Sequence, residues 1–189
     1  MSGRNAKKIG KTDKNVCSTD NINERLQITR RKLPHWTLKG STYFVTFRTV
    51  LRQAGMPVLL SVEEQKLVLK QILNGNGKFY TLIAVVVMPE HVHMLLIPIE
   101  GYELSRIMKG IKGTTARKLN LKRGTIGSIW EDEAFDRIIR DQYELDEKLN
   151  YMLYNPVKRH LVKNPWEYYG WYFNEAYFAI KNGSKIIQN

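Results

Sequence analysis

Hydrophobic positions repeat with two different periods along the middle of the chain, and these periods predict its strands and helices. Segments rich in aromatic and β-branched residues, or apolar throughout, are typical of strands. Segments whose apolar residues recur every three to four positions are typical of amphipathic helices. The pattern predicts strands at 43–50, 80–88, 91–97 and 135–140, and helices at 61–73 and 103–120 and from 142 onward.

Local signals mark the ends of these helices. Ser61-Val-Glu-Glu64 is a capping box, and Asn74-Gly-Asn-Gly77 should stop the helix that follows it. Asp141, with Glu144 three residues later, should begin the last helix. Pro156 disfavours helical geometry at the residue before it, so we expect this helix to bend or end there.

The helix at 103–120 has the clearest two-faced pattern. Six residues form one stripe that should face the core, while Arg106, Lys109 and Arg117 lie opposite it and Lys112 lies on its border. The members of the stripe are Leu104, Ile107, Met108, Ile111, Thr115 and Leu119.

The order of the first six elements predicts an α+β fold. They follow the βαββαβ order of the ferredoxin-like arrangement, an antiparallel sheet with helices on one face. The strands 80–88 and 91–97 are separated only by Pro89 and Glu90, which is too short a connection for anything but an antiparallel pair. In this topology the first and third strands lie at the centre of the sheet, and a C-terminal helix follows.

The charge of the chain indicates an acidic polymer as its partner. Its 189 residues carry a formal net charge of +12, and 43% of them are apolar, which is enough for a packed core. Nucleic acid is the usual partner of such a protein, and an anionic membrane is the alternative. No apolar run of roughly 18 residues is present to span a bilayer.

Other features of the composition suggest an intracellular protein. The N-terminus is polar and basic, so it does not resemble a secretory signal. Cys17 is the only cysteine, which excludes intramolecular disulfides and cysteine-rich zinc sites. We expect a cytoplasmic location, in association with the nucleoid.

The composition divides the chain into three parts. Residues 1–32 hold nine basic and three acidic side chains, nine minus three giving +6, and few apolar ones, so they are predicted to form a flexible basic arm. The arm would either attract phosphates or act as a solubilising tail. Residues 33–165 form the predicted folded domain, and 166–189 an extension that packs on it or trails from it.

Two histidines interrupt the apolar stretch from Val85 to Ile97. His91 and His93 are two residues apart on a predicted strand, so their side chains project from the same face of the sheet. Two adjacent imidazoles form half of a metal site, because neutral histidine is the commonest protein metal ligand. The alternative is a pair of core histidines held by hydrogen bonds.

The last helix carries a tyrosine and an amide on one face. Tyr151 and Asn155 are four residues apart, at the margin of the apolar stripe of this helix. Two histidines and an amide oxygen would make a three-ligand metal site with positions open for phosphate oxygens, and a tyrosine hydroxyl could attack the phosphodiester held there. The oxygen ligands favour Mg²⁺ or Mn²⁺, whereas two imidazoles alone would suit zinc. Taken alone, Tyr151 is more typical of a structural residue whose ring packs and whose hydroxyl reaches water.

Several motifs resemble those of one family. Met88-Pro-Glu-His-Val-His-Met-Leu-Leu96 resembles the histidine-hydrophobe-histidine (HUH) signature of the single-tyrosine transposases, and the segment 151–162 resembles their catalytic helix. Leu33-Pro-His-Trp36, followed by Tyr43-Phe-Val-Thr-Phe-Arg48, resembles the branch called REP-associated tyrosine transposases. The family's pattern before the last helix is matched by Trp130, Phe135, Asp136, Arg137, Ile139 and Arg140.

The resemblance implies an enzyme that acts on single-stranded DNA. Members are metal-dependent endonucleases and strand transferases that act at DNA hairpins through a 5′-phosphotyrosine and release a 3′-hydroxyl. It implies His91, His93 and Asn155 as metal ligands and Tyr151 as the nucleophile, although other members carry Gln at the third-ligand position. Glu90 stands where Asn is frequent, so it is either a candidate extra metal ligand or a solvated turn carboxylate. The branch is expected to be monomeric.

The contacts to DNA are predicted from charge alone. Basic residues on and after the helix 103–120 would bind the DNA backbone, or they would simply form a solvated face. They are Lys109, Lys112, Arg117, Lys122 and Arg123. The competing hypothesis for the whole protein is a non-catalytic ferredoxin-like module whose sheet aromatics stack on bases.

Overall fold

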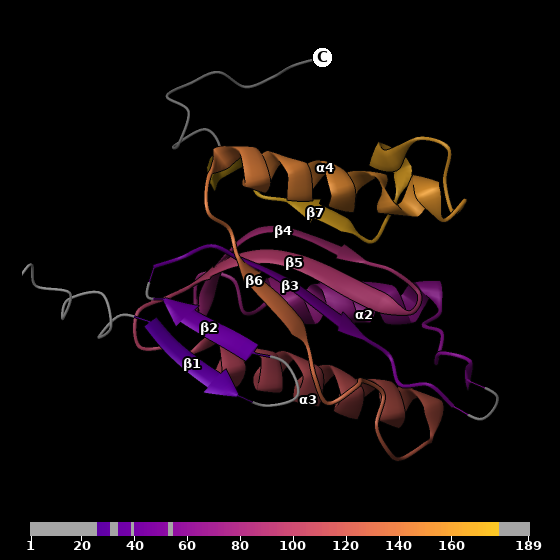
Figure 1. Cartoon of the computed structure of the whole chain (residues 1–189). Coiled ribbons are helices and arrows are strands. Elements are labelled where there is room, and N and C mark those ends of the chain that lie inside the picture. Colours follow the sequence, from indigo (N-terminus) through magenta and orange to yellow (C-terminus); the bar gives the residue numbers. More distant parts are fainter. Residues whose placement is uncertain (1–25, 31–33, 39, 53–54, 178–189) are drawn as a thin grey trace, which may run out of the picture.

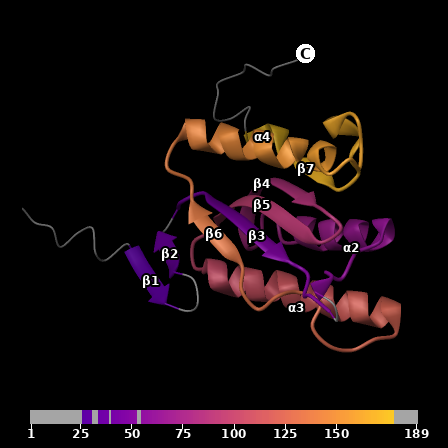
Figure 2. The same cartoon turned by 45° about the vertical axis from the view of Figure 1, so that its right-hand side comes forward.

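A five-stranded antiparallel sheet forms the centre of the molecule, with helices on both of its faces (Figures 1 and 2). The structure is a computed structural model that describes residues 26–30, 34–38, 40–52 and 55–177. The strand order is β6-β3-β5-β4-β7, and α3 and α4 lie on opposite sides of the sheet. The strands are β3 (Tyr43–Arg48), β4 (Tyr80–Val87), β5 (His91–Pro98), β6 (Phe135–Ile138) and β7 (Trp171–Phe173), and the helices are α2 (Val62–Leu73), α3 (Leu104–Arg123) and α4 (Gln142–Lys158).

This topology confirms the predicted α+β fold. The elements from β3 to β6 follow the βαββαβ order, and β3 and β5, the first and third strands of that unit, pair at the centre of the sheet. The fifth strand, β7, comes from the C-terminal extension and pairs with β4. The described part of the extension therefore packs on the domain, while residues 178–189 lie outside the described residues.

A separate two-stranded sheet precedes this unit and corrects one boundary. Strand β1 (Leu26–Arg30) pairs antiparallel with β2 (Pro34–Leu38), with Ile28 opposite Trp36. The first of these strands falls inside the stretch 1–32 that charge predicted to be an arm. The apolar residues of 26–30 alternate with polar ones, as in a half-buried strand. The prediction of an arm used the net charge of the whole stretch and did not consider this short alternation. The rest of the predicted arm, residues 1–25 and 31–32, lies outside the described residues.

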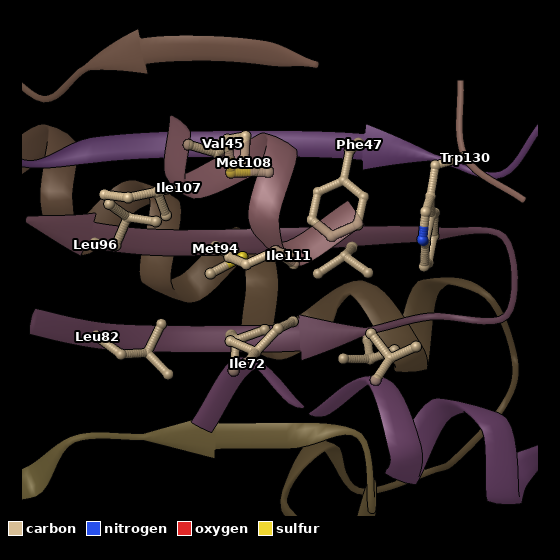
Figure 3. Close-up of a cluster of buried hydrophobic side chains, with 14 of the residues drawn as sticks. Val45, Phe47, Ile72, Leu82, Met94, Leu96, Ile107, Met108, Ile111 and Trp130 are labelled. Atoms are coloured by element: carbon tan, nitrogen blue, oxygen red, sulfur yellow. The ribbon is translucent and has the colours of Figure 1, made fainter. Parts of the chain in front are cut away.

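The larger hydrophobic core lies between the sheet and the helices α2 and α3 (Figure 3). All six residues of the stripe predicted on α3 are buried. Thr115, the polar member of that stripe, accepts a hydrogen bond from Nε1 of Trp130 (2.9 Å) and donates to the carbonyl of Ile111 (2.7 Å). The Thr115 hydroxyl and the Trp130 N–H therefore both have hydrogen-bond partners inside this core.

A smaller core lies under α4, on the other face of the sheet. Leu145 and Met152 of α4 pack with Phe44 of β3 and Leu95 of β5. Strand residues alternate between faces, so the other odd-numbered residues of β5, including His91 and His93, also lie on the α4 side. Val92 lies in the larger core, as this alternation requires.

Helices α3 and α4 both extend past their predicted ends. Helix α3 continues to Arg123 and ends at Gly124, whose φ of 62° is the left-handed conformation that favours glycine. Helix α4 begins after Asp141 as predicted, and Pro156 lies inside its last turn. Proline lacks the N–H that would donate a hydrogen bond to the Met152 carbonyl, but the helix continues for two more residues, to Lys158. Within the described ranges, no helix combines the length and the apolar character that crossing a membrane requires.

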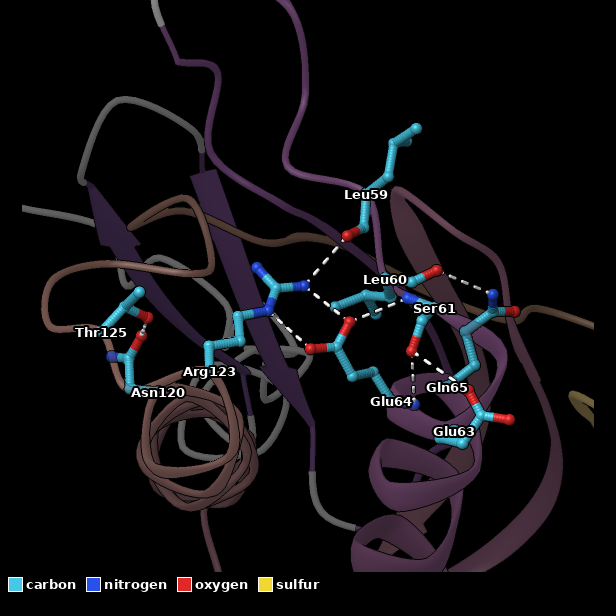
Figure 4. A network of polar contacts seen from close by, with 9 residues as sticks. All are labelled: Leu59, Leu60, Ser61, Glu63, Glu64, Gln65, Asn120, Arg123 and Thr125. Atoms are coloured by element: carbon cyan, nitrogen blue, oxygen red, sulfur yellow. Dashed lines mark hydrogen bonds and ion pairs between the residues drawn. The ribbon is translucent and has the colours of Figure 1, made fainter.

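An ion pair joins α2 to α3 (Figure 4). The guanidinium of Arg123 donates to both carboxylate oxygens of Glu64, at 2.5 and 2.7 Å, and to the carbonyl of Leu59 at 2.9 Å. Glu64 also accepts the Ser61 N–H, which completes the predicted capping box. The hydrogen bonds from Arg123 lower the pKa of Glu64 despite its burial, so the carboxylate is charged at neutral pH. Arg123 therefore holds the two helices together.

We predict that Arg123→Met lowers the free energy of unfolding by about 2 kcal/mol at pH 7, because it removes the charged partner of the buried Glu64 carboxylate, which keeps the hydrogen bond from the Ser61 N–H. The matched change Lys122→Met removes an exposed charge beside it and should stay within about 0.5 kcal/mol of wild type. Chemical denaturation measures both values. The Glu64 pKa is depressed by folding, so the pair stabilises the protein above pH 4.5 and loses this contribution as the pH falls further. The difference between wild type and Arg123→Met should therefore shrink in acid, and equal stability of the two proteins at pH 7 would contradict the role of the pair.

Candidate active site

The two histidines lie side by side on β5, on the face that α4 covers. Their ring centroids are 4.6 Å apart, and both side chains are buried. In the pairing of β3 with β5, Thr46 is opposite His93 and Arg48 is opposite His91. The centre of the sheet thus fixes both rings next to each other, as the spacing predicted.

Hydrogen bonds fix the orientation of each ring. Nδ1 of His91 lies 3.2 Å from a carboxylate oxygen of Glu90, which can only accept, so this Nδ1 carries the proton. Nε2 of His93 lies 3.4 Å from the amide nitrogen of Asn155, which can only donate, so the proton of His93 is on Nδ1, 2.7 Å from the Thr46 hydroxyl. Both neutral rings therefore carry their lone pair on Nε2, the nitrogen that a metal could bind, and in His93 a metal would replace the hydrogen bond from Asn155.

Burial keeps both rings neutral at physiological pH. It lowers the pKa of His93 to about 3, and the charge of Arg48, together with that of His91 once His91 is protonated in acid, acts in the same direction. Burial also lowers the pKa of His91, against the opposing effect of the Glu90 carboxylate. Neutral imidazole is the form that binds metal ions, so no proton has to be removed first.

Helix α4 brings the tyrosine and the asparagine to these rings. The ring centroid of Tyr151 lies 5.2 Å from that of His93 and 6.3 Å from that of Phe44, and the side chain is 40% exposed. Asn155, one helical turn later, is buried, and its Oδ1 has no hydrogen-bond partner. An unpaired buried acceptor is costly, and such groups occur where function requires them.

These donors fit a divalent cation with positions left open. Among the described residues no three His, Cys, Asp or Glu side chains converge on a metal position, so His91 and His93 would need another type of ligand. The free Oδ1 of Asn155 is such a ligand, and it lies in the side chain that already contacts Nε2 of His93. Two nitrogens and one oxygen leave the remaining positions of the cation to oxygens from outside the chain.

Glu90 is not the solvated turn carboxylate that the sequence suggested. Its Oε1 accepts from Arg159 at 2.7 Å and from His91 at 3.2 Å, and the side chain is 20% exposed. It contacts Nδ1 of His91, the nitrogen on the other side of the ring from a metal at Nε2. This geometry favours an orienting role over a ligand role. Arg159 caps the C-terminal end of α4, so the contact also joins this helix to the turn before β5.

A cavity of 580 Å³ opens beside His93 and Tyr151, and we call it the cleft. Its walls come from β3, from β6 with the loop before it, and from α4. Three basic side chains reach it, and the predictions from sequence missed them as site residues. A signal was present, because Arg48 alternates with Thr46 on the site face of β3 and Lys148 precedes Tyr151 by three residues on α4. The lining residues are Phe44, Thr46, Phe47, Arg48, His93, Glu131, Glu133, Ala134, Phe135, Arg137, Lys148 and Tyr151.

The basic residues predicted to contact DNA all lie on α3, across the sheet from the histidines (Figure 1). Two of them have structural partners: Lys112 donates to the Asp132 carbonyl at 2.7 Å, and Arg123 pairs with Glu64. The others, Lys109, Arg117 and Lys122, are exposed, and their contact with DNA stays a prediction.

Comparisons with known proteins show which family and which fold this chain resembles. Residues 59–144 match the family described as "Transposase IS200 like", a range that contains both histidines and ends before Tyr151. A REP-associated tyrosine transposase of Haemophilus influenzae is 27% identical over 143 residues, which cover 69% of this chain and 79% of that protein.

A solved structure extends the likeness to the fold. A REP-associated tyrosine transposase bound to a REP hairpin superposes with a TM-score of 0.59 at 19% identity, covering 85% of this chain and 94% of that one. This chain is thus similar in sequence to the IS200-like transposases and to a REP-associated tyrosine transposase, and it is similar in fold to another REP-associated tyrosine transposase.

Proposed function

We propose that this protein is a metal-dependent endonuclease and strand transferase that cuts single-stranded DNA at hairpins through a 5′-phosphotyrosine. The observation that carries the proposal is the convergence of α4 on β5. Tyr151 and Asn155 both contact His93 within one chain, at 5.2 Å between rings and 3.4 Å between Nδ2 and Nε2. A candidate nucleophile and three candidate metal ligands thus lie close together, and two of these residues, Tyr151 and His93, line the cleft.

The reaction at Tyr151 is a transesterification. Its hydroxyl oxygen attacks the phosphorus, and the bond from phosphorus to the 3′-oxygen breaks. The phenol loses one proton and the leaving 3′-oxygen gains one, so the step leaves the number of protons unchanged. One phosphoester replaces another, so the step needs no external energy source and can be reversed by the 3′-hydroxyl of a second strand. That reversal is strand transfer.

The residues around the nucleophile would hold the metal and the DNA. His91, His93 and Asn155 would bind Mg²⁺ or Mn²⁺, which when bound polarises the scissile phosphate. The basic residues that line the cleft would attract the DNA backbone, and the formal charge of +12 supports a polyanionic substrate for the chain as a whole. These basic residues are Arg48, Arg137, which also pairs with Glu144 at 2.6 Å, and Lys148, which pairs with Glu147 at 3.0 Å.

The exposed aromatic residues of the cleft suit an unpaired strand. Phe135 is 51% exposed and lines the cleft with Tyr151, so it offers a ring on which a base could stack. The REP-associated tyrosine transposase of similar fold is bound to a REP hairpin, and a hairpin with an unpaired flank would supply such a base here. Because one chain contains the whole cluster, we propose that a monomer suffices.

The alternative of a non-catalytic binding module explains less. Such a module needs neither a tyrosine beside two neutral histidines nor a buried amide oxygen without a partner. The unpaired amide oxygen costs stability unless the site binds a group that contacts it.

We predict that Tyr151→Phe abolishes cleavage of a hairpin DNA and the covalent adduct, because only the attacking oxygen is removed. DNA binding should stay within about twofold of wild type. The matched control is Tyr154→Phe, which removes the same hydroxyl from an exposed tyrosine on the same helix and should cleave normally. Denaturing gels and peptide mapping of the adduct measure both. Cleavage by Tyr151→Phe, or an adduct at Tyr154, would contradict the assignment.

We predict that Glu90→Gln weakens Mn²⁺ binding about 10- to 100-fold, the usual cost of losing a group that orients a ligating histidine. Arg159→Met should weaken it in the same direction, because Glu90 then loses its anchor on α4. Glu100→Gln, an exposed acid after β5, is the control. Titration calorimetry with Mn²⁺ in the absence of DNA gives the affinities. If Glu90 were itself a ligand, Arg159→Met would leave the affinity unchanged or raise it.

A further inference from the structure

Thr46 lies between the candidate metal ligand His93 and the open space of the cleft. It is opposite His93 in the pairing of β3 with β5, and its hydroxyl oxygen is 2.7 Å from Nδ1 of that ring. The same residue lines the cleft and is only half-buried. A molecule in the cleft could therefore reach a side chain that already contacts the histidine.

The hydrogen bond with His93 uses only part of the bonding capacity of this hydroxyl. A threonine hydroxyl has one proton to donate and two lone pairs that accept. Here it accepts, because the proton of His93 is on Nδ1 while Nε2 faces the amide nitrogen of Asn155. Within the described part of the chain, no further hydrogen bond of the Thr46 hydroxyl is present. Its own proton is therefore left for a partner in the cleft.

The surroundings of Thr46 favour a phosphate oxygen as that partner. Arg48 follows two residues later on the same face of β3, is exposed, and lines the cleft together with Arg137 of β6. Glu131 and Glu133 also line the cleft, but a carboxylate only accepts hydrogen bonds. The donors that β3 and β6 bring to the cleft are thus Thr46 and the two arginines. Positive charge attracts the backbone of a nucleic acid, and an ionised phosphate accepts stronger hydrogen bonds than a neutral group does.

We infer that Thr46 is a substrate-binding residue whose hydroxyl accepts the Nδ1 proton of His93 and donates its own proton to a phosphate oxygen of single-stranded DNA. The inference rests on the proposed function, which supplies the DNA and a divalent cation at Nε2 of His93. No covalent bond changes at the threonine. One side chain would hold both the ring that binds the cation and the strand beside it, and it would thereby fix the position of one relative to the other.

The first test measures the affinity for a fluorescein-labelled 20-mer of thymidine, by anisotropy in EDTA so that no metal contributes. Thr46→Val keeps the shape of the side chain but removes the hydroxyl, and it should weaken binding roughly 10-fold, the effect of losing one hydrogen bond to a charged group. Thr46→Ser keeps the hydroxyl and should bind within about threefold of wild type. The matched control is Thr81→Val, the same change on β4 opposite Ile97 and outside the cleft lining, which should bind as wild type does.

Two comparisons identify the group that accepts from Thr46. Threonine carries no charge, so Thr46→Val should leave the dependence of log affinity on log salt unchanged. A displaced Arg48 would instead reduce this slope by about 0.7 for each phosphate contact that is lost, and such a reduction would contradict the inference. A 20-mer of abasic nucleotides keeps every phosphate and lacks the oxygens of the bases, so wild type should exceed Thr46→Val in affinity by the same ratio on this strand. A ratio near one there would show that the acceptor is a base, which would also contradict the inference.

The contact with His93 is tested separately, by titration calorimetry with Mn²⁺ in the absence of DNA. Thr46→Val should weaken Mn²⁺ binding about 10- to 100-fold, because the ring loses the group that orients it, and Thr46→Ser should restore the affinity. DNA binding by Thr46→Val within twofold of Thr81→Val, or an unchanged Mn²⁺ affinity, would overturn the inference. A wild-type protein that binds the 20-mer and Mn²⁺ but cleaves no hairpin would instead overturn the proposed function and leave these results standing. Failure of wild type to bind the 20-mer would overturn both.

Discussion

The alternation of side chains on β5 is the constraint on which the site depends. Its even-numbered residues fill the larger core against α2 and α3, and its odd-numbered residues face α4. Strand register has a period of two, so a slip by one residue would bury the histidines in the core and expose Val92 at the site. Pairing with β3 on one side and β4 on the other prevents this, and it fixes Thr46 against His93. The fold is therefore what places two imidazoles on one surface.

Buried polar groups on the two faces of the sheet differ in whether they have hydrogen-bond partners. In the larger core the Tyr80 hydroxyl donates to the Ile72 carbonyl, and Trp130 donates to Thr115. At the site, Oδ1 of Asn155 is buried without a partner and two neutral histidines stand close together. Buried polar groups without hydrogen-bond partners are expected at functional sites, because the binding of a ligand or a metal there compensates their cost in stability.

Much of this organisation could be predicted from sequence because it is periodic. Hydrophobic spacing predicted the βαββαβ unit and every buried residue of the α3 stripe, and residue spacing predicted which side chains share a face. The strand β1 was missed because net charge conceals a short alternating segment. The strand β7 was missed because three residues are too few to show a period.

The contacts between distant segments could not be predicted in this way. The sequence contains no sign that Arg159 reaches Glu90, 69 positions earlier, or that Arg123 pairs with Glu64 rather than with DNA. Both depend on which helix faces which strand, and this is decided by packing. The basic side chains of the cleft could not be grouped from sequence either, since they come from two different strands and a helix that only packing brings together.

The central claim is that one chain supplies both the histidines of β5 and the tyrosine of α4. Mixing two inactive variants tests it most directly: Tyr151→Phe retains the histidines, and His93→Ala retains the tyrosine. The two proteins are unfolded together, refolded together and assayed on a hairpin DNA, so that any mixed assembly can form. We expect no cleavage above that of either variant alone. Restored cleavage in the mixture would show that the site is shared between two chains and would contradict the claim.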